Sequence, residues 1–112
     1  MTQFKIGSRK VGAGTEPLII AELGINHNGS LDIAISLADK AIKAGAEVIK
    51  HQTHIPNDEM THHAKKIIPL NAKINIYDLI SKYSLSEKKE KMLMNYIKSK
   101  KKIFISTPFS RA

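Results

Sequence analysis

Two short apolar runs on either side of one amphipathic stretch constrain the fold of this chain more than any other feature. Residues 18–22 (LIIAE) and 46–50 (AEVIK) lack the strict alternation of a half-exposed strand, and such runs are typical of strands buried on both faces of a parallel sheet. Residues 31–42 carry apolar side chains at three- and four-residue spacing, which predicts a helix with Ser30 as its N-cap and Gly45 after its end. Together these segments span about 33 residues, the size of one βαβ unit.

The second half of the chain adds a helix and a strand. Residues 103–107 (IFIST) are predicted as a third buried strand that stops at Pro108. The helix before it is predicted to begin near Ser84 or Ser86, because Ser84 and Glu87 have the spacing of a capping box.

Two segments lie outside this strand and helix pattern. Residues 4–14 combine alternating apolar positions with three glycines, which predicts a short hairpin or arm. Residues 53–83 form a long connection in which residues 75–82 are predicted as a short helix. Connections of this length are usually functional or disordered.

The order of these elements indicates the fold class. Strand, helix, strand, connection, helix and strand follow one another, and right-handed crossovers make all three strands parallel. A closed (β/α)8 barrel typically needs about 250 residues, whereas this sequence has 112. We therefore interpret residues 1–112 as one α/β unit, the first three β/α units of a truncated TIM barrel.

The chain is strongly basic, with 18 lysines and arginines against 10 acidic residues and a net charge of +8. Basic chains can bind nucleic acids, because lysines neutralise phosphates. Arg9 and Arg111 are the only arginines, however, and direct reading of guanine relies mainly on arginine. A small basic nucleic-acid-binding domain is therefore the less favoured alternative, and a solvated lysine face is preferred.

Composition also bears on the compartment. Cysteine is absent, which excludes disulfides and thiolate zinc sites. The longest apolar run, residues 17–21, is far shorter than the roughly 20 residues that span a bilayer. The first ten residues lack the apolar core of a signal peptide. We expect a cytoplasmic protein without a membrane partner.

Polar side chains stand at the carboxyl end of each predicted strand, where parallel α/β folds place their active sites. Glu22 ends the first strand, and Lys50 and Gln52 end the second. Thr107 ends the third. All four are predicted to converge on one rim. The alternative is structural: Glu22 and Lys50 would form a salt bridge, and the other two would cap backbone groups.

The chain holds five histidines: His27, His51, His54, His62 and His63. His62 and His63 are adjacent and cannot both face one metal from regular structure. The spacing of His51 and His54 matches no standard ligand pattern. No complete metal site is predicted in this chain.

Three segments in order resemble the sialic acid synthase family: residues 20–29 (IAELGINHNG), 48–54 (VIKHQTH) and 104–111 (FISTPFSR). The resemblance implies a TIM barrel followed by a small antifreeze-like domain, within a homodimer, so that most of the barrel and the C-terminal domain are absent from this chain. It also implies condensation of phosphoenolpyruvate with N-acetylmannosamine or a related N-acylated sugar, giving a nine-carbon keto-sugar acid and phosphate. A divalent cation, Mn²⁺ or Mg²⁺, is implied, with its ligands outside these residues.

The resemblance also implies roles for individual residues. Glu22 is similar to the carboxylate beside the reacting end of the sugar, a general acid/base or orienting group. Lys50 and Thr107 resemble ligands of the phosphoenolpyruvate anion. Contacts to the sugar are implied for three further side chains: Gln52, Asn71 and Phe109.

Other substrates stay open at this stage. A legionaminate or pseudaminate synthase, or another phosphoenolpyruvate-dependent keto-sugar acid synthase, would share these motifs. Because three strands cannot close a barrel and the cation ligands are expected elsewhere, the isolated chain is expected to be inactive.

Overall fold

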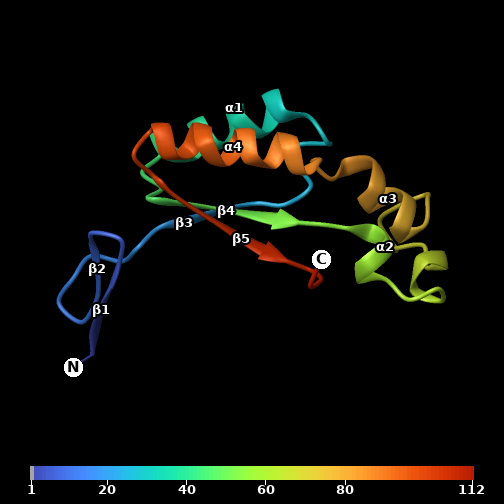
Figure 1. Ribbon diagram of the computed structural model, residues 1–112. Helices are drawn as coiled ribbons and strands as arrows, with labels where there is room; N and C mark the ends of the chain where they lie inside the picture. The colour runs from blue at the N-terminus through green and yellow to red at the C-terminus, as the bar shows by residue number, and fades with distance from the viewer. Residues whose placement is uncertain (1) are drawn as a thin grey trace.

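The computed structural model describes residues 2–112 (Figure 1). An antiparallel hairpin opens the chain, with strands β1 (Gln3–Ile6) and β2 (Arg9–Gly12). A parallel sheet follows, whose strands keep the order of the sequence: β3 (Ile20–Leu23), β4 (Val48–Thr53) and β5 (Ile103–Pro108). The two long helices are α1 (Leu31–Lys43) and α4 (Glu87–Ser99). The connection after β4 contains α2 (Pro56–Glu59), the 3-10 turn η1 (Ala64–Lys66) and α3 (Ile76–Tyr83).

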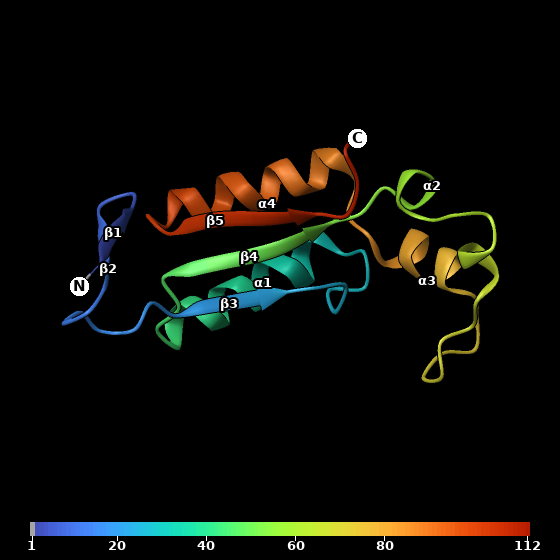
Figure 2. The same cartoon turned by 90° about the horizontal axis from the view of Figure 1, so that it is seen from below.

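Both long helices lie on the same side of the parallel sheet (Figures 1 and 2). A doubly wound sheet would instead carry helices on both faces. The predicted α/β class with parallel strands is confirmed. No helix within residues 2–112 covers the other side, here named the open face. Strand alternation assigns it these residues: Ile20, Glu22, Val48, Lys50, Gln52, Ile103, Ile105 and Thr107.

The apolar core lies between the sheet and the two long helices. Ile49 of β4 and Leu93 and Ile97 of α4 are completely buried, and each such side chain contributes about 1.5–3 kcal/mol through burial. On the open face, Ile20 and Ile105 are 48% and 38% exposed. The main core of the sheet is therefore on its helix side, and the other side is incompletely covered.

The hairpin that was predicted at residues 4–14 is confirmed, and one ion pair ties it to the sheet. Arg9 Nε donates to Glu47 Oε2 at 2.7 Å, and Arg9 Nη2 donates to Glu47 Oε1 at 3.2 Å. The hydrogen bond from Arg9 also lowers the pKa of Glu47. Because Glu47 directly precedes β4, the hairpin lies at the amino ends of the strands.

Several predicted boundaries need correction. The second strand was predicted over residues 46–50, whereas β4 runs over Val48–Thr53, and the third was predicted to stop before Pro108, whereas β5 includes it. The first strand begins at Ile20 rather than at Leu18, because the carbonyl of Ile19 accepts from Glu47 and Val48 before the regular ladder begins. The predicted capping box at Ser84 is wrong, because Ser84 is the C-cap of α3.

The start of α4 is set two residues later than that capping box requires. Ser86 is the N-cap, and its hydroxyl accepts from the backbone N–H of Lys89 at 3.4 Å. Lys91 Nζ lies 2.6 Å from Glu87 Oε1, an i,i+4 ion pair that supports the first turns of the helix.

The long connection is anchored at its end. The predicted helix at residues 75–82 is confirmed as α3, whose N-cap Asn75 accepts from the backbone N–H of Asp78 at 2.8 Å. Gly29, in the loop after β3, has φ +72°, and a Cβ there would lie 2.9 Å from the carbonyl oxygen of Lys82. The loop and the end of α3 therefore approach so closely that a side chain does not fit between them.

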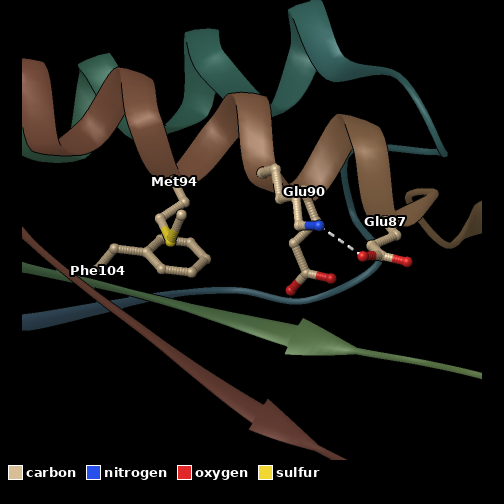
Figure 3. Close-up of a pocket in the computed structure, with 5 residues that line it drawn as sticks. Glu87, Glu90, Met94 and Phe104 are labelled. Atoms are coloured by element: carbon tan, nitrogen blue, oxygen red, sulfur yellow. Dashed lines mark hydrogen bonds and ion pairs between the residues drawn. The ribbon is translucent and has the colours of Figure 1, made fainter. Parts of the chain in front are cut away.

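A shallow groove runs beside β5, at the free edge of the sheet (Figure 3). Its lining is Glu87, Glu90, Lys91, Met94 and Phe104. Met94 of α4 lies over the ring of Phe104, while Glu90 points from α4 toward the sheet (Figure 3). The groove is thus apolar at one end and acidic at the other.

None of the helices within residues 2–112 has the length and the apolar character that crossing a bilayer requires.

Candidate functional site

Three polar side chains meet on the open face toward the carboxyl end of the sheet. Gln52 Nε2 donates to Glu22 Oε1 at 2.8 Å, and Lys50 Nζ lies 3.5 Å from Glu22 Oε2. Strand register explains the cluster, because Glu22 stands opposite Lys50 in the β3–β4 pair and Gln52 follows two residues later on the same face.

The contacts of Glu22 determine its charge. The hydrogen bond from Gln52, and next the positive charge of Lys50, lower the pKa of Glu22 below its ordinary value. The carboxylate is therefore ionised near neutral pH and can accept a hydrogen bond from a ligand hydroxyl.

Lys50 remains accessible to a ligand. Its contact with Glu22 is long, and both side chains are partly exposed, so the pair itself adds little to stability. An ammonium group has three donors, which leaves donors on Lys50 for an anion on the open face.

The other three candidate residues are Thr107, Phe109 and Asn71. Thr107 is opposite Gln52 in the β4–β5 register. Phe109 follows β5, and its ring stacks on that of His54 with centroids 4.3 Å apart. Asn71 is exposed in a turn between η1 and α3, on a loop that extends away from the sheet (Figure 2). The structure does not bring Asn71 to the cluster.

His54 continues the cluster beyond the end of β4. Its Nε2 is 3.4 Å from Gln52 Oε1, and its Nδ1 is 2.9 Å from Glu59 Oε1. Glu59 Oε2 also accepts from the backbone N–H of Ile55 at 3.1 Å. The side chains of His54 and Glu59 are each only 5% exposed, so this is a buried contact beside the exposed cluster.

A second polar network lies on the helix side of the sheet. His27 Nε2 is 3.1 Å from His51 Nε2, and His51 Nδ1 is 2.8 Å from Glu90 Oε1. The backbone N–H of Gly29 donates to His27 Nδ1 at 3.1 Å. These donors and acceptors match when both rings are neutral. His27 then donates from Nε2 to His51 Nε2, and His51 donates from Nδ1 to Glu90.

Burial sets the charges of this network. Burial, and next the neighbouring His51, lower the pKa of His27 to about 4. Although burial alone would raise the pKa of Glu90, hydrogen bonds from His51, Thr53 and Ser106 hold it below its ordinary value. The network thus links the loop after β3, strands β4 and β5, and α4. No buried polar side chain among residues 2–112 is left without a hydrogen-bond partner.

Sequence reasoning missed both the His54 contact and the buried network. Alternation along β4 was the available signal: His51 shares a face with Ile49, whereas His54 shares a face with Lys50 and Gln52. The acidic partners, Glu90 and Glu59, lie in helices whose placement the pattern does not give. No group of three histidine, cysteine or acidic side chains that could hold a metal ion occurs within residues 2–112.

The parallel sheet with its connecting helices makes this an α/β protein. Its cluster of an acidic, a basic and an amide side chain lies at the carboxyl ends of the strands, which is where α/β enzymes place their active sites. The model of the NeuB family matches residues 37–112. The chain belongs to the NeuB family, which confirms the predicted relationship to sialic acid synthases.

Named relatives agree with this membership. Spore coat polysaccharide biosynthesis protein SpsE of Bacillus subtilis is 34% identical over 109 residues, covering 96% of this chain and 29% of the relative. N,N'-diacetyllegionaminic acid synthase of Campylobacter jejuni is 36% identical over 97 residues, covering 82% of this chain and 29% of the relative. The chain therefore spans about 29% of the length of these curated relatives.

A solved structure gives the same result. The N-acetylneuraminic acid (sialic acid) synthetase of Leptospira borgpetersenii serovar Hardjo-bovis, in complex with citrate, aligns with a TM-score of 0.80 and 25% sequence identity. The alignment covers 98% of this chain and 35% of that chain.

Proposed function

We propose that these residues are the first three β/α units of a TIM barrel, and that the complete protein condenses phosphoenolpyruvate with an N-acylated amino sugar. The products are a nine-carbon keto-sugar acid and phosphate. The observation that carries the proposal is the contact of Glu22 with Lys50 and Gln52 at the carboxyl end of the parallel sheet. Family membership supports the same reaction class.

The unfinished packing of the sheet supports the barrel. Its strands run in sequence order with both long helices on one side, as in each arc of a (β/α)8 barrel. The exposed isoleucines of the open face, Ile20 and Ile105, would then face the barrel interior. The groove along β5, with Met94 and Phe104, would receive the next β/α unit (Figure 3).

The cluster suits both substrates. Lys50 offers ammonium donors to the carboxylate or phosphate of phosphoenolpyruvate, with Thr107 as a hydroxyl partner. Glu22, held ionised by its neighbours, accepts from a reacting hydroxyl and can take its proton. Carbon–carbon bond formation joins C3 of phosphoenolpyruvate to the aldehyde carbon of the sugar, whose oxygen takes up a proton and becomes a hydroxyl. Water then adds to C2, the carbon that carries the phosphate, and phosphate leaves as the C2 carbonyl forms.

The cation that the family resemblance implies does not fit the residues described. No group of side chains that could hold a metal ion occurs within residues 2–112. Glu22 is already paired with the ammonium group of Lys50 and the amide of Gln52. Any ligands of Mn²⁺ or Mg²⁺ belong to other parts of the protein. The described residues act on the anion and on hydroxyl groups.

The sugar is proposed as a class. N-acetylmannosamine is one candidate, and the similarity to a diacetyllegionaminic acid synthase makes diacetylated amino sugars another. Gln52 is the amide of the cluster that can contact either sugar, with Asn71 and Phe109 as further proposed contacts. A cytoplasmic homodimer, with no nucleic acid or membrane partner, completes the proposal.

Phosphate release from phosphoenolpyruvate tests the proposal. We would assay the full-length protein with N-acetylmannosamine, with a diacetylated amino sugar and without sugar, in the presence of Mn²⁺. Sugar-dependent release is expected, and Lys50→Ala should reduce it while the exposed Lys88→Ala should not. Release without any sugar dependence, or equal rates in both variants, would contradict the proposed function.

A further inference from the structure

We propose that His54 is a positioning residue for this site: doubly protonated between Glu59 and Gln52, it orients the Gln52 amide toward Glu22. The consequence for catalysis rests on the proposed function, whereas the protonation state of the ring does not. The chain of contacts runs from Glu59 through His54 and Gln52 to Glu22, across 2.9, 3.4 and 2.8 Å.

The two ends of this chain are carboxylates, which fixes the direction of every hydrogen bond. Glu22 accepts, so Gln52 turns its Nε2 toward Glu22 and its Oε1 toward His54. His54 Nε2 then faces an amide oxygen while Nδ1 faces the carboxylate of Glu59. Only a ring with a proton on both nitrogens can donate to both acceptors.

The surroundings of His54 favour this cationic form. Glu59, at the end of α2, is the only charged side chain within hydrogen-bond distance of the ring in the part of the chain that the structure describes. The side chains of both residues are only 5% exposed, and the Phe109 ring covers the imidazole at 4.3 Å. A buried carboxylate beside an imidazole stabilises the imidazolium.

Other charged groups near His54 lie farther away. The cavity on the α4 side of the ring is also lined by Glu87, Glu90 and Arg111. Glu90 is engaged by His51, and Glu87 pairs with Lys91. The protonation state of the His54 ring should therefore depend mainly on the charge of Glu59.

A cationic His54 has a direct effect on the substrate cluster. It prevents the Gln52 amide from flipping and so keeps an N–H donor, rather than an oxygen, against Glu22. Glu22 consequently stays a hydrogen-bond acceptor for a substrate hydroxyl. His54 touches no substrate in this scheme and acts through Gln52.

The test uses the full-length protein labelled with nitrogen-15 at histidine, without substrates. His54→Gln assigns the resonances of the ring by their loss. At pH 7 we expect both ring nitrogens of His54 to be protonated in the wild type and in Glu59→Asp, and one to lose its proton in Glu59→Gln. The exposed Glu16→Gln is the matched control and should leave the signals unchanged. A neutral His54 in the wild type, or a ring that ignores Glu59→Gln, would overturn the proposal.

Kinetics supply a second readout. The alkaline limb of the kcat/KM profile is expected to move toward lower pH in Glu59→Gln, because the carboxylate beside the ring favours its charged form. Glu16→Gln should keep the wild-type profile. An unchanged alkaline limb in Glu59→Gln would refute the positioning role. If the wild type had no synthase activity, the proposed function would fail, and the resonances would still decide the state of His54.

Discussion

Acidification is expected to destabilise the fold through one buried imidazole, that of His27. The ring is only 1% exposed, accepts from the backbone N–H of Gly29 and contacts His51. Its pKa is lowered from 6.5 to about 4. As the pH falls below 6.5, the unfolded chain therefore takes up this proton before the folded chain does.

The sign and the size follow from linkage. A depressed folded-state pKa gives stability that is complete above the unfolded pKa of 6.5 and is lost progressively as the pH falls to about 4. Each unit of difference between the folded and the unfolded pKa corresponds to about 1.4 kcal/mol of stability. The loss from this one group is thus of the order of 3 kcal/mol between neutral pH and pH 4.

Urea unfolding of the full-length protein at several pH values, followed by circular dichroism, measures this loss. His27→Gln keeps a donor and an acceptor but cannot titrate, so its free energy of unfolding should fall by about 3 kcal/mol less than that of the wild type. The exposed His63→Gln should behave as the wild type. Parallel pH profiles for wild type and His27→Gln would refute the reasoning.

Three further changes test the site and its support. Lys50→Ala should weaken use of phosphoenolpyruvate about ten- to a hundredfold, because a charge-assisted contact to an anion is worth about 1.5–3 kcal/mol; unchanged steady-state kinetics would remove Lys50 from the site. Glu22→Gln should lower turnover by about 10²–10⁴-fold while calorimetry shows phosphoenolpyruvate binding nearly intact, and full turnover would leave Glu22 a structural rim residue. Gly29→Ala should lower the free energy of unfolding by about 2 kcal/mol or more through left-handed strain and the close carbonyl of Lys82. Gly14→Ala, at φ +77° with open space around it, should cost less, and equal losses would exclude the steric contribution.

The regular elements could be predicted from the sequence because periodicity reports which face of an element is buried. The spacing of apolar residues in α1 and the apolar runs of β4 and β5 carry that information locally. Glu22 and Lys50 could be placed together for the same reason, since parallel strands bring their carboxyl ends to one edge. The parallel register of β3 and β4 places Glu22 directly opposite Lys50.

The rest depends on helix placement, which local patterns do not give. Ser84 and Glu87 have capping-box spacing, yet Leu85 is buried and α4 starts only after Ser86. Glu90 meets His51 across 39 positions, and this contact exists only because α4 packs on that face of the sheet. Asn71 could not be placed from its motif either, because it lies in a turn of the long connection, on a loop that extends away from the sheet (Figure 2).

The product of the reaction tests the central claim most directly. Full-length protein would be incubated with Mn²⁺, carbon-13-labelled phosphoenolpyruvate and N-acetylmannosamine or a diacetylated amino sugar, and the products analysed by mass spectrometry. The account predicts a nine-carbon keto-sugar acid that carries the three labelled carbons, formed together with phosphate, and no such product from residues 1–112 alone. Phosphate without a labelled nine-carbon acid, or the labelled acid from residues 1–112 alone, would contradict it.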